Sequence, residues 1–121
     1  MKSGTTPNQG DIVLVPIPFT DLSAFKKRPA LVLSTTAYNR RSNDIIVAGI
    51  TSNPAAKGTI IPIADDCIVQ GTLPVKSYVR AANVYTLDKR IIVKVYGRLD
   101  KSFVQRVLSH LDIVFGKNTT E

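Results

Sequence analysis

The 121-residue sequence contains no tryptophan, one cysteine, one methionine and one histidine. The single cysteine, Cys67, cannot form an intramolecular disulfide. Because the chain has only this cysteine and one histidine, His110, a cysteine-rich metal site is excluded. We therefore predict no metal ion and no cofactor in the functional site. A free cysteine of this kind is typically a small buried side chain, and we expect Cys67 to be one.

Acidic residues are also few, and their shortage gives the chain a strong charge. The sequence has 9 Asp and Glu against 16 Lys and Arg, a formal net charge of +7 and an isoelectric point near 9.8. This sign of charge suits a polyanion or an acidic protein partner. A basic surface also serves solubility, so charge alone does not choose between these roles.

Long hydrophobic runs are absent as well. The longest apolar stretches, at 12–17 and 45–50, are far shorter than the ~20 residues of a membrane-spanning helix. Residues 3–9 are polar and lack the charged-then-apolar layout of a signal peptide. We expect a cytoplasmic protein with no membrane contact.

The remaining composition is that of one folded globular domain, with 44% hydrophobic and 21% charged residues. We predict a flexible leader at 1–9, a single domain at 10–116 and a flexible tail at 117–121. Short β-type runs succeed one another inside the domain. They lie at 12–17, 30–34, 45–51, 59–63, 77–86 and 91–98.

The last segment changes period and predicts an amphipathic helix over 103–115, with apolar residues three and four apart. Asp100 is the expected N-cap, and Gly116 the expected stop. His110 falls at the border of the apolar stripe, where we expect a solvated or capping side chain. The fold class is thus mainly β with a C-terminal α-helix, a small barrel or sandwich.

Four motifs follow one another along the chain. The sequences GDIVLV at 10–15 and KRPALVLS at 27–34 resemble the N-terminal signature of the MazF/PemK toxin family. IVAGITS at 46–52 resembles the family's strand that ends in threonine, and VYTLDKR at 84–90 its later strand-to-turn element. Together these pieces cover nearly the whole chain, in the family's order and with similar spacing.

The resemblance implies an SH3-like β-barrel of the MazF/PemK/CcdB-like toxin fold and a homodimer. It also implies the toxin of a type II toxin–antitoxin system, which inhibits growth as a metal-independent mRNA interferase cleaving single-stranded RNA. An acidic, MazE-like antitoxin is the implied protein partner. The family's active site carries over onto Arg28 and Thr51, with Ser52 as possible catalytic support.

These residue types suit the implied chemistry. RNA cleaves itself when its 2′-hydroxyl attacks the adjacent phosphorus, leaving a 2′,3′-cyclic phosphate and a 5′-hydroxyl end. The planar fork of Arg28 can hold two phosphate oxygens and stabilise the extra negative charge of the transition state. Thr51 can donate its hydroxyl to a non-bridging oxygen. The sequence does not identify the general base, because an arginine is a poor one.

Binding several nucleotides requires cations for the phosphates and faces on which unpaired bases rest. Each such residue is also explained as a solvated charge or a packing aromatic. Arg40 and Arg41 are further candidate cations, and they too are explained as solvated charges. The predicted RNA-binding set comprises Lys26, Lys27, Lys57, Lys76 and Arg80 for phosphates, and Phe19, Phe25 and Tyr78 for bases.

A non-catalytic protein on the same fold is the alternative. One form is a CcdB-like topoisomerase poison, and the other is an inactive or repurposed nucleic-acid-binding module. The CcdB-like form places its functional residues at the end of the C-terminal helix, where this chain has Phe115-Gly116-Lys117 and no tryptophan. The ribonuclease interpretation is therefore preferred.

Overall fold

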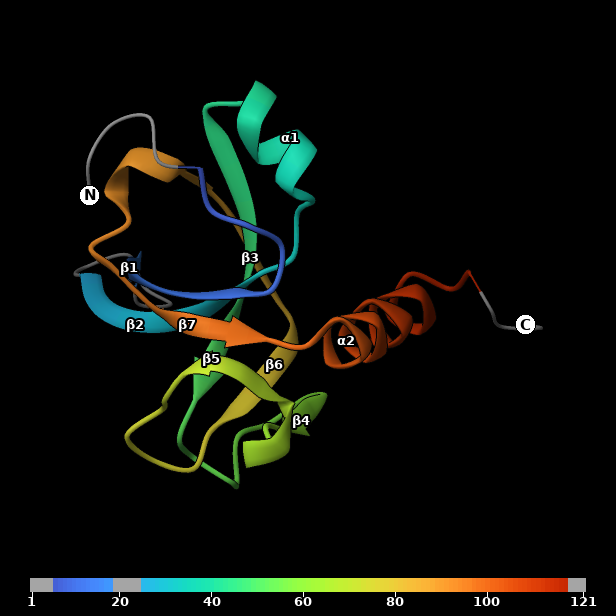
Figure 1. Cartoon of the computed structure of the whole chain (residues 1–121). Coiled ribbons are helices and arrows are strands. Elements are labelled where there is room, and N and C mark those ends of the chain that lie inside the picture. Colours follow the sequence, from blue (N-terminus) through green and yellow to red (C-terminus); the bar gives the residue numbers. More distant parts are fainter. Residues whose placement is uncertain (1–5, 19–24, 118–121) are drawn as a thin grey trace.

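The computed structural model describes residues 6–18 and 25–117, and these ranges form seven strands, two α-helices and two 3-10 turns (Figure 1). Along the chain the elements are β1 (Asp11–Pro18), β2 (Phe25–Val32), α1 (Thr36–Arg41), β3 (Asp44–Thr51), β4 (Ile60–Pro62), η1 (Asp65–Cys67), β5 (Ile68–Gly71), β6 (Tyr78–Asp88), η2 (Lys89–Ile91), β7 (Lys94–Leu99) and α2 (Lys101–Val114).

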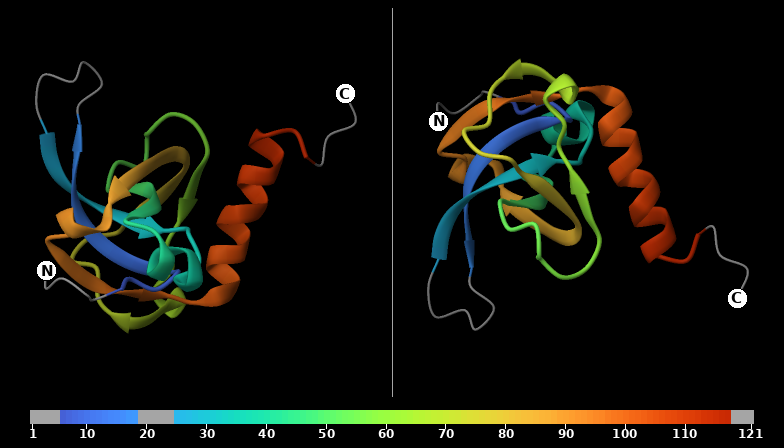
Figure 2. Two further views of the ribbon diagram at one scale, coloured as in Figure 1. Left: turned by 90° about the horizontal axis from the view of Figure 1, so that it is seen from above. Right: turned by 90° about the horizontal axis from the view of Figure 1, so that it is seen from below.

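One antiparallel sheet contains these strands in the order β4-β6-β3-β2-β1-β7-β5. The sheet curls strongly, so the two edge strands β4 and β5 lie in the same part of the molecule, and α2 flanks the sheet (Figures 1 and 2). No pairing joins β4 to β5 within the described ranges. The predicted mainly β fold with a C-terminal helix is confirmed, with an open, barrel-like sheet rather than a fully closed barrel.

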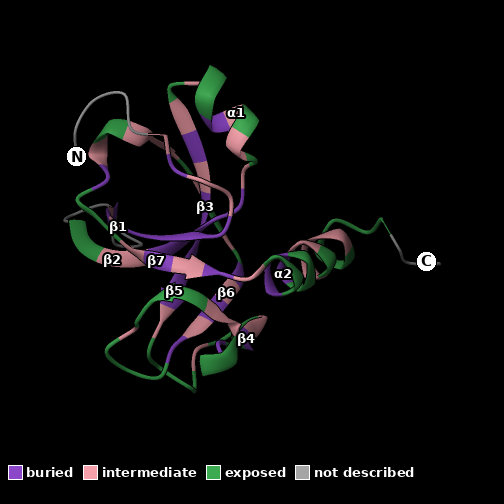
Figure 3. Ribbon diagram, in the orientation of Figure 1, coloured by how far each residue is buried: buried purple, intermediate pink, exposed green. Residues whose placement is uncertain are grey.

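Buried residues run along the central strands (Figure 3). Because side chains alternate along a strand, these residues form two cores on opposite faces of the sheet. On β1, Ile12 points into one cluster, whereas Val13 and Val15 point into another. The helix-side core consists of Ile12, Leu31, Leu33, Ala48, Ile50, Ile61, Ile63, Val79, Ala81, Leu99, Phe103, Val104 and Val107. The far-side core consists of Val13, Val15, Ile17, Ala30, Val32, Ile45, Val47 and Ile92.

Helix α2 covers the helix-side core with one face. Its predicted N-cap is confirmed, since the Asp100 carboxylate accepts a hydrogen bond from the backbone N–H of Phe103 at 2.7 Å. Gly116 lies just beyond the helix with a φ of 81°, a conformation that favours glycine. His110 contacts only the Arg106 carbonyl oxygen of the same helix, among the contacts described, at 2.8 Å. That position fits the predicted solvated or capping role.

Cys67 is half-buried and packs against the helix-side core, so it is less enclosed than the sequence predicts. Burial and the neighbouring Asp100 carboxylate raise the pKa of its thiol. A raised pKa disfavours the thiolate, which is the reactive form of cysteine.

Several elements differ from the sequence prediction. The sequence does not predict α1, because six residues are too few for an apolar period; Thr35 caps this helix by accepting from the Tyr38 N–H at 3.1 Å. Nor does it predict β5, a four-residue edge strand whose residues are mostly exposed. The run expected at 30–34 belongs to β2, which begins earlier, at Phe25. The sequence does not predict this start, because the first three residues of β2 are exposed and show no alternation.

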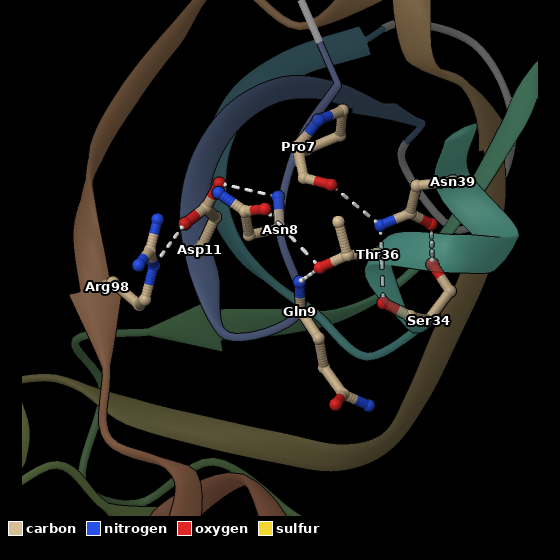
Figure 4. A network of polar contacts seen from close by, with 8 residues as sticks. All are labelled: Pro7, Asn8, Gln9, Asp11, Ser34, Thr36, Asn39 and Arg98. Atoms are coloured by element: carbon tan, nitrogen blue, oxygen red, sulfur yellow. Dashed lines mark hydrogen bonds and ion pairs between the residues drawn. The ribbon is translucent and has the colours of Figure 1, made fainter.

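Residues 7–9, within the predicted leader, are hydrogen-bonded to the domain (Figure 4). The buried Asn39 amide donates to the Pro7 carbonyl oxygen at 3.0 Å, and the Gln9 N–H donates to the Thr36 hydroxyl at 3.1 Å. The Asn8 N–H donates to the Asp11 carboxylate at 2.8 Å. Residues 1–5 of the leader and 118–121 of the tail lie outside the described residues.

Neither helix of the described ranges combines the length and apolar character that crossing a membrane requires.

Candidate active site

Arg28 and Thr51 share one face of the sheet because of strand alternation and register. On β2, Arg28 is two residues from Ala30, which belongs to the far-side core. On β3, Thr51 is four residues from Val47 of the same core. Ala30 pairs with Gly49, so the two strands present this face side by side. The face that carries the far-side core therefore continues to Arg28, midway along β2, and to Thr51, the last residue of β3.

A cleft of about 730 Å³ opens at this point, and both Arg28 and Thr51 line it. Strands β1, β2, β3 and β6 contribute to its walls, together with the segment that follows Thr51. Its lining consists of Ile17, Arg28, Gly49, Ile50, Thr51, Ser52, Asn53, Ala55, Ala56, Lys57, Arg80, Asn83 and Tyr85. We refer to it as the Arg28 cleft.

Arg28 and Thr51 each bring to this cleft a donor that no described residue uses. Arg28 is half-buried, and no described residue forms a hydrogen bond or an ion pair with its guanidinium. The Thr51 hydroxyl oxygen accepts a hydrogen bond from the backbone N–H of Asn53 at 3.1 Å. That contact fixes the oxygen and leaves the hydroxyl proton available for a ligand.

Arg80 brings a second guanidinium to the Arg28 cleft from β6. Its terminal nitrogen Nη2 donates to the Lys57 carbonyl oxygen at 3.4 Å, a long contact. Its Nε is buried and has no hydrogen-bond partner among the described residues. A buried donor without a partner is costly, which is typical of a group that a ligand satisfies.

The charge of the described cleft lining is entirely positive. Arg28, Lys57 and Arg80 line it, and the described lining includes no Asp, Glu or His. Three cations in one cleft form a suitable environment for phosphate oxygens. No cluster of three or more potential metal ligands occurs in the described parts of the chain.

A family model matches most of the chain. The model described as "PemK-like, MazF-like toxin of type II toxin-antitoxin system" matches residues 8–115. The chain belongs to this PemK-like, MazF-like toxin family. Comparison with curated proteins gives no significant match.

Solved structures with the same fold include an endoribonuclease and MazF proteins. An endoribonuclease from Mycobacterial species is 19% identical, with 95% of this chain and 96% of that chain covered and a TM-score of 0.72. MazF from Deinococcus radiodurans is 23% identical, with coverages of 93% and 98% and a TM-score of 0.72. A MazE-MazF structure from the same organism is 26% identical, with coverages of 93% and 98% and a TM-score of 0.66.

The structure of this PemK-like, MazF-like toxin brings together only part of the predicted site. Arg28, Thr51, Ser52, Lys57 and Arg80 all line the cleft. Among the other predicted residues of β2, Lys26 alternates onto the same face as Arg28, and Lys27 onto the opposite face.

The remaining predicted RNA-binding residues lie elsewhere. Lys76 lines a separate hollow of about 400 Å³ with Val75 and Ser77. Tyr78 pairs with Thr51 across β3 and β6 but does not line the Arg28 cleft, and Phe25 is 69% exposed at the start of β2. Phe19 lies outside the described residues.

The cleft residues that sequence reasoning missed include two polar ones on β6, Asn83 and Tyr85. The β3–β6 register explains why. Ala48 pairs with Val84, but Ile50 pairs with Val79, so β6 carries extra residues between these two pairs. An irregularity of this size turns the strand and cannot be read from an alternating pattern.

Proposed function

We propose that this toxin is a metal-independent endoribonuclease that cleaves single-stranded RNA in the cytoplasm. The observation that carries the proposal is the presence of Arg28 and Thr51, both with donors that no described residue uses, in one positively charged cleft. The reaction is attack of the RNA 2′-hydroxyl on the adjacent phosphorus, with departure of the 5′ oxygen. The products are a 2′,3′-cyclic phosphate and a 5′-hydroxyl end.

Arg28 is the main electrostatic catalyst in this proposal. Its fork binds two oxygens of the scissile phosphate, and its contacts strengthen as negative charge builds up on the phosphorane. The half-buried position of Arg28 supports this role, because an interaction of charges is stronger where water is partly excluded. One such donor typically contributes about 3 to 4 kcal/mol to the barrier.

Thr51 positions the same phosphate. The Thr51 hydroxyl oxygen accepts from the Asn53 N–H, so the side chain is already ordered before a ligand binds. Its hydroxyl proton can then bind a phosphate oxygen with little further loss of side-chain freedom. Ser52 follows it on the rim of the cleft, where it is exposed and can support the same phosphate. Lys57 and Arg80 then neutralise neighbouring phosphates along the cleft.

The antitoxin is proposed to compete for this surface. One relative of known structure is a MazE-MazF complex, and the net charge of +7 on this chain favours an acidic partner. An acidic segment in the Arg28 cleft would occupy the phosphate-binding cations and stop RNA from entering. The toxin itself is proposed to act as a homodimer.

The test is incubation of the purified protein with a long single-stranded RNA in excess EDTA, followed by mapping of the product ends. Wild type is expected to cut at defined sites, Arg28→Ala to lose cleavage, and Thr51→Ala to be strongly impaired while Thr51→Ser retains activity. Arg41→Ala and Thr86→Ala are matched controls, because both residues are exposed and lie outside the cleft lining. Intact RNA from folded wild-type protein would favour the non-catalytic binding protein instead.

A further inference from the structure

Tyr85 is the only aromatic residue among those described that lines the Arg28 cleft. It lies on β6 opposite Val47 and packs against the far-side core, so its ring is held in place from below. Its half-buried ring leaves one part accessible to the cleft, and its hydroxyl has no hydrogen-bond partner within the described ranges. An aromatic ring that is fixed in place and partly accessible can contact a nucleobase.

Gly49 occupies the neighbouring position on β3, where it is buried and places no side chain beside this ring. A Cβ at Gly49 would lie 3.8 Å from the Asn83 Cβ and 4.0 Å from the Tyr85 Cε2. Asn83 and Tyr85 therefore flank Gly49, and nothing of Gly49 projects between them. Thr51 lies two residues further along the same face of β3, at the position proposed for the scissile phosphate.

Asn83 supplies hydrogen-bonding capacity to the same place. Its side-chain amide has two donors and one acceptor, and no described residue pairs with it. An amide of this kind can bind the Watson–Crick edge of an unpaired base. The ring of Tyr85 is tolerant of any base, whereas the amide of Asn83 distinguishes among bases.

We propose that Tyr85, Gly49 and Asn83 form a nucleobase subsite next to the scissile phosphate. The base of a neighbouring nucleotide stacks on Tyr85 above Gly49, and Asn83 binds its edge. The identification of the ligand as RNA rests on the proposed function. A base in this subsite must be unpaired, so the subsite also selects single-stranded over duplex RNA.

The test uses uniformly 2′-O-methylated oligonucleotides, which bind but cannot be cleaved, and an abasic oligomer of the same length and charge. Fluorescence anisotropy gives the ratio of their affinities for each variant. We expect wild type to prefer the base-bearing oligomer and Tyr85→Leu to lose about 5- to 150-fold of that preference, the effect of one stacked base. Tyr85→Phe keeps the ring and should keep the preference.

Two further variants protect the test from a folding defect in Tyr85→Leu. Gly49→Ala adds a methyl group that meets only ordinary contacts, so the protein should fold while the subsite narrows and the preference falls. Asn83→Ala should keep the preference over the abasic oligomer but reduce the difference among A, C, G and U oligomers. An unchanged preference in Gly49→Ala, or in folded Tyr85→Leu, would overturn the subsite.

The outcomes distinguish a failure of the proposed subsite from a failure of the proposed nuclease activity. A wild-type protein that cuts no RNA but shows a Tyr85-dependent preference supports the subsite and refutes the nuclease. Metal-free cleavage combined with the same preference in Tyr85→Leu as in wild type supports the nuclease and overturns the subsite.

Discussion

Gly71 of β5 and Gly97 of β7 pair so closely that neither position has room for a side chain. A Cβ at Gly71 would overlap the carbonyl oxygen of Tyr96, and a Cβ at Gly97 would overlap the carbonyl oxygen of Gln70. This contact holds the edge strand β5 onto the sheet, next to a register shift between Ile68 and Gln70.

Gly71→Ala is therefore expected to lower the free energy of unfolding by about 2 to 4 kcal/mol, measured by urea denaturation. Two effects combine in that value, the overlap and the φ of 80° at Gly71. Gly58→Ala is the matched control, because Gly58 has a φ of 90° with no atom near the added Cβ. The control should lose only about 1 kcal/mol. Equal losses in the two variants would mean that the overlap relaxes without cost.

The ion pair between Asp11 and Arg98 joins the first and last strands of the domain. Arg98 Nε lies 3.0 Å from one oxygen of Asp11, and the Asn8 N–H donates to the other oxygen (Figure 4). The Asp11 side chain is only 7% exposed. Removal of Arg98 would leave a nearly buried carboxylate without its cation.

Arg98→Met is expected to lower the free energy of unfolding by about 2 to 3 kcal/mol, below the full cost for a buried pair because Arg98 is 39% exposed. Arg106→Met on the exposed side of α2 should change it by less than about 1 kcal/mol. A double-mutant cycle with Asp11→Ala measures the coupling. Additive losses in the cycle would show that the pair itself contributes nothing.

The parts of this fold that the sequence predicts are those with a local signal. The C-terminal helix is predicted because its apolar period and the Asp100 cap lie within one segment. Arg28 and Thr51 are predicted because the family motifs mark them, one by one, along the chain. Their shared cleft needs only the alternation of β2 and β3 and the pairing of Ala30 with Gly49.

The parts that the sequence does not predict depend on register. Tyr85 and Asn83 enter the cleft only because β6 shifts its pairing with β3 between Val79 and Val84. Phe25 and Tyr78 are aromatic residues as suitable as Tyr85 by composition, but their strands place them outside the cleft. Residue type thus predicts what the cleft needs, while long-range pairing decides which residue supplies it.

Asp88 is a partly exposed carboxylate whose titration tests the contact with Arg90. The Arg90 side chain and its backbone N–H both bind this carboxylate and lower the pKa of Asp88 to about 2. Arg90→Ala should raise that pKa towards its ordinary value of about 4, as measured by NMR titration of the carboxyl carbon. Lys89→Ala should shift it far less, since Lys89 is the weakest of the contributing causes.

The sign of the linked stability follows from the lowered pKa. A carboxylate whose pKa is lower in the folded protein than in the unfolded one stabilises the fold at pH values above its unfolded pKa. This stabilisation is lost as the pH falls from about 4 to about 2. The effect is small because the pair is solvated. An unchanged Asp88 pKa in Arg90→Ala would mean that the ion pair does not persist in solution.

Lys57 offers a test of phosphate binding that does not depend on cleavage. If Lys57 neutralises one phosphate, Lys57→Ala should reduce the slope of log K against log salt by about 0.7 for an uncleavable single-stranded oligomer. Lys101→Ala removes the same charge from an exposed position on α2, outside the described cleft lining, and should leave the slope unchanged. A loss of slope in Lys101→Ala equal to that in Lys57→Ala would indicate a general charge effect.

The geometry of Arg28 is tested by a change that keeps its charge. Arg28→Lys retains the cation but replaces a planar fork with a point charge, so it should hold only one phosphate oxygen at a time. We expect kcat to fall about 100-fold with a small change in KM, because the lost contact is the one that strengthens in the transition state. Arg28→Ala should lower kcat further and also raise KM. Wild-type kcat in Arg28→Lys would mean that positive charge alone, without the bidentate fork, is sufficient for cleavage.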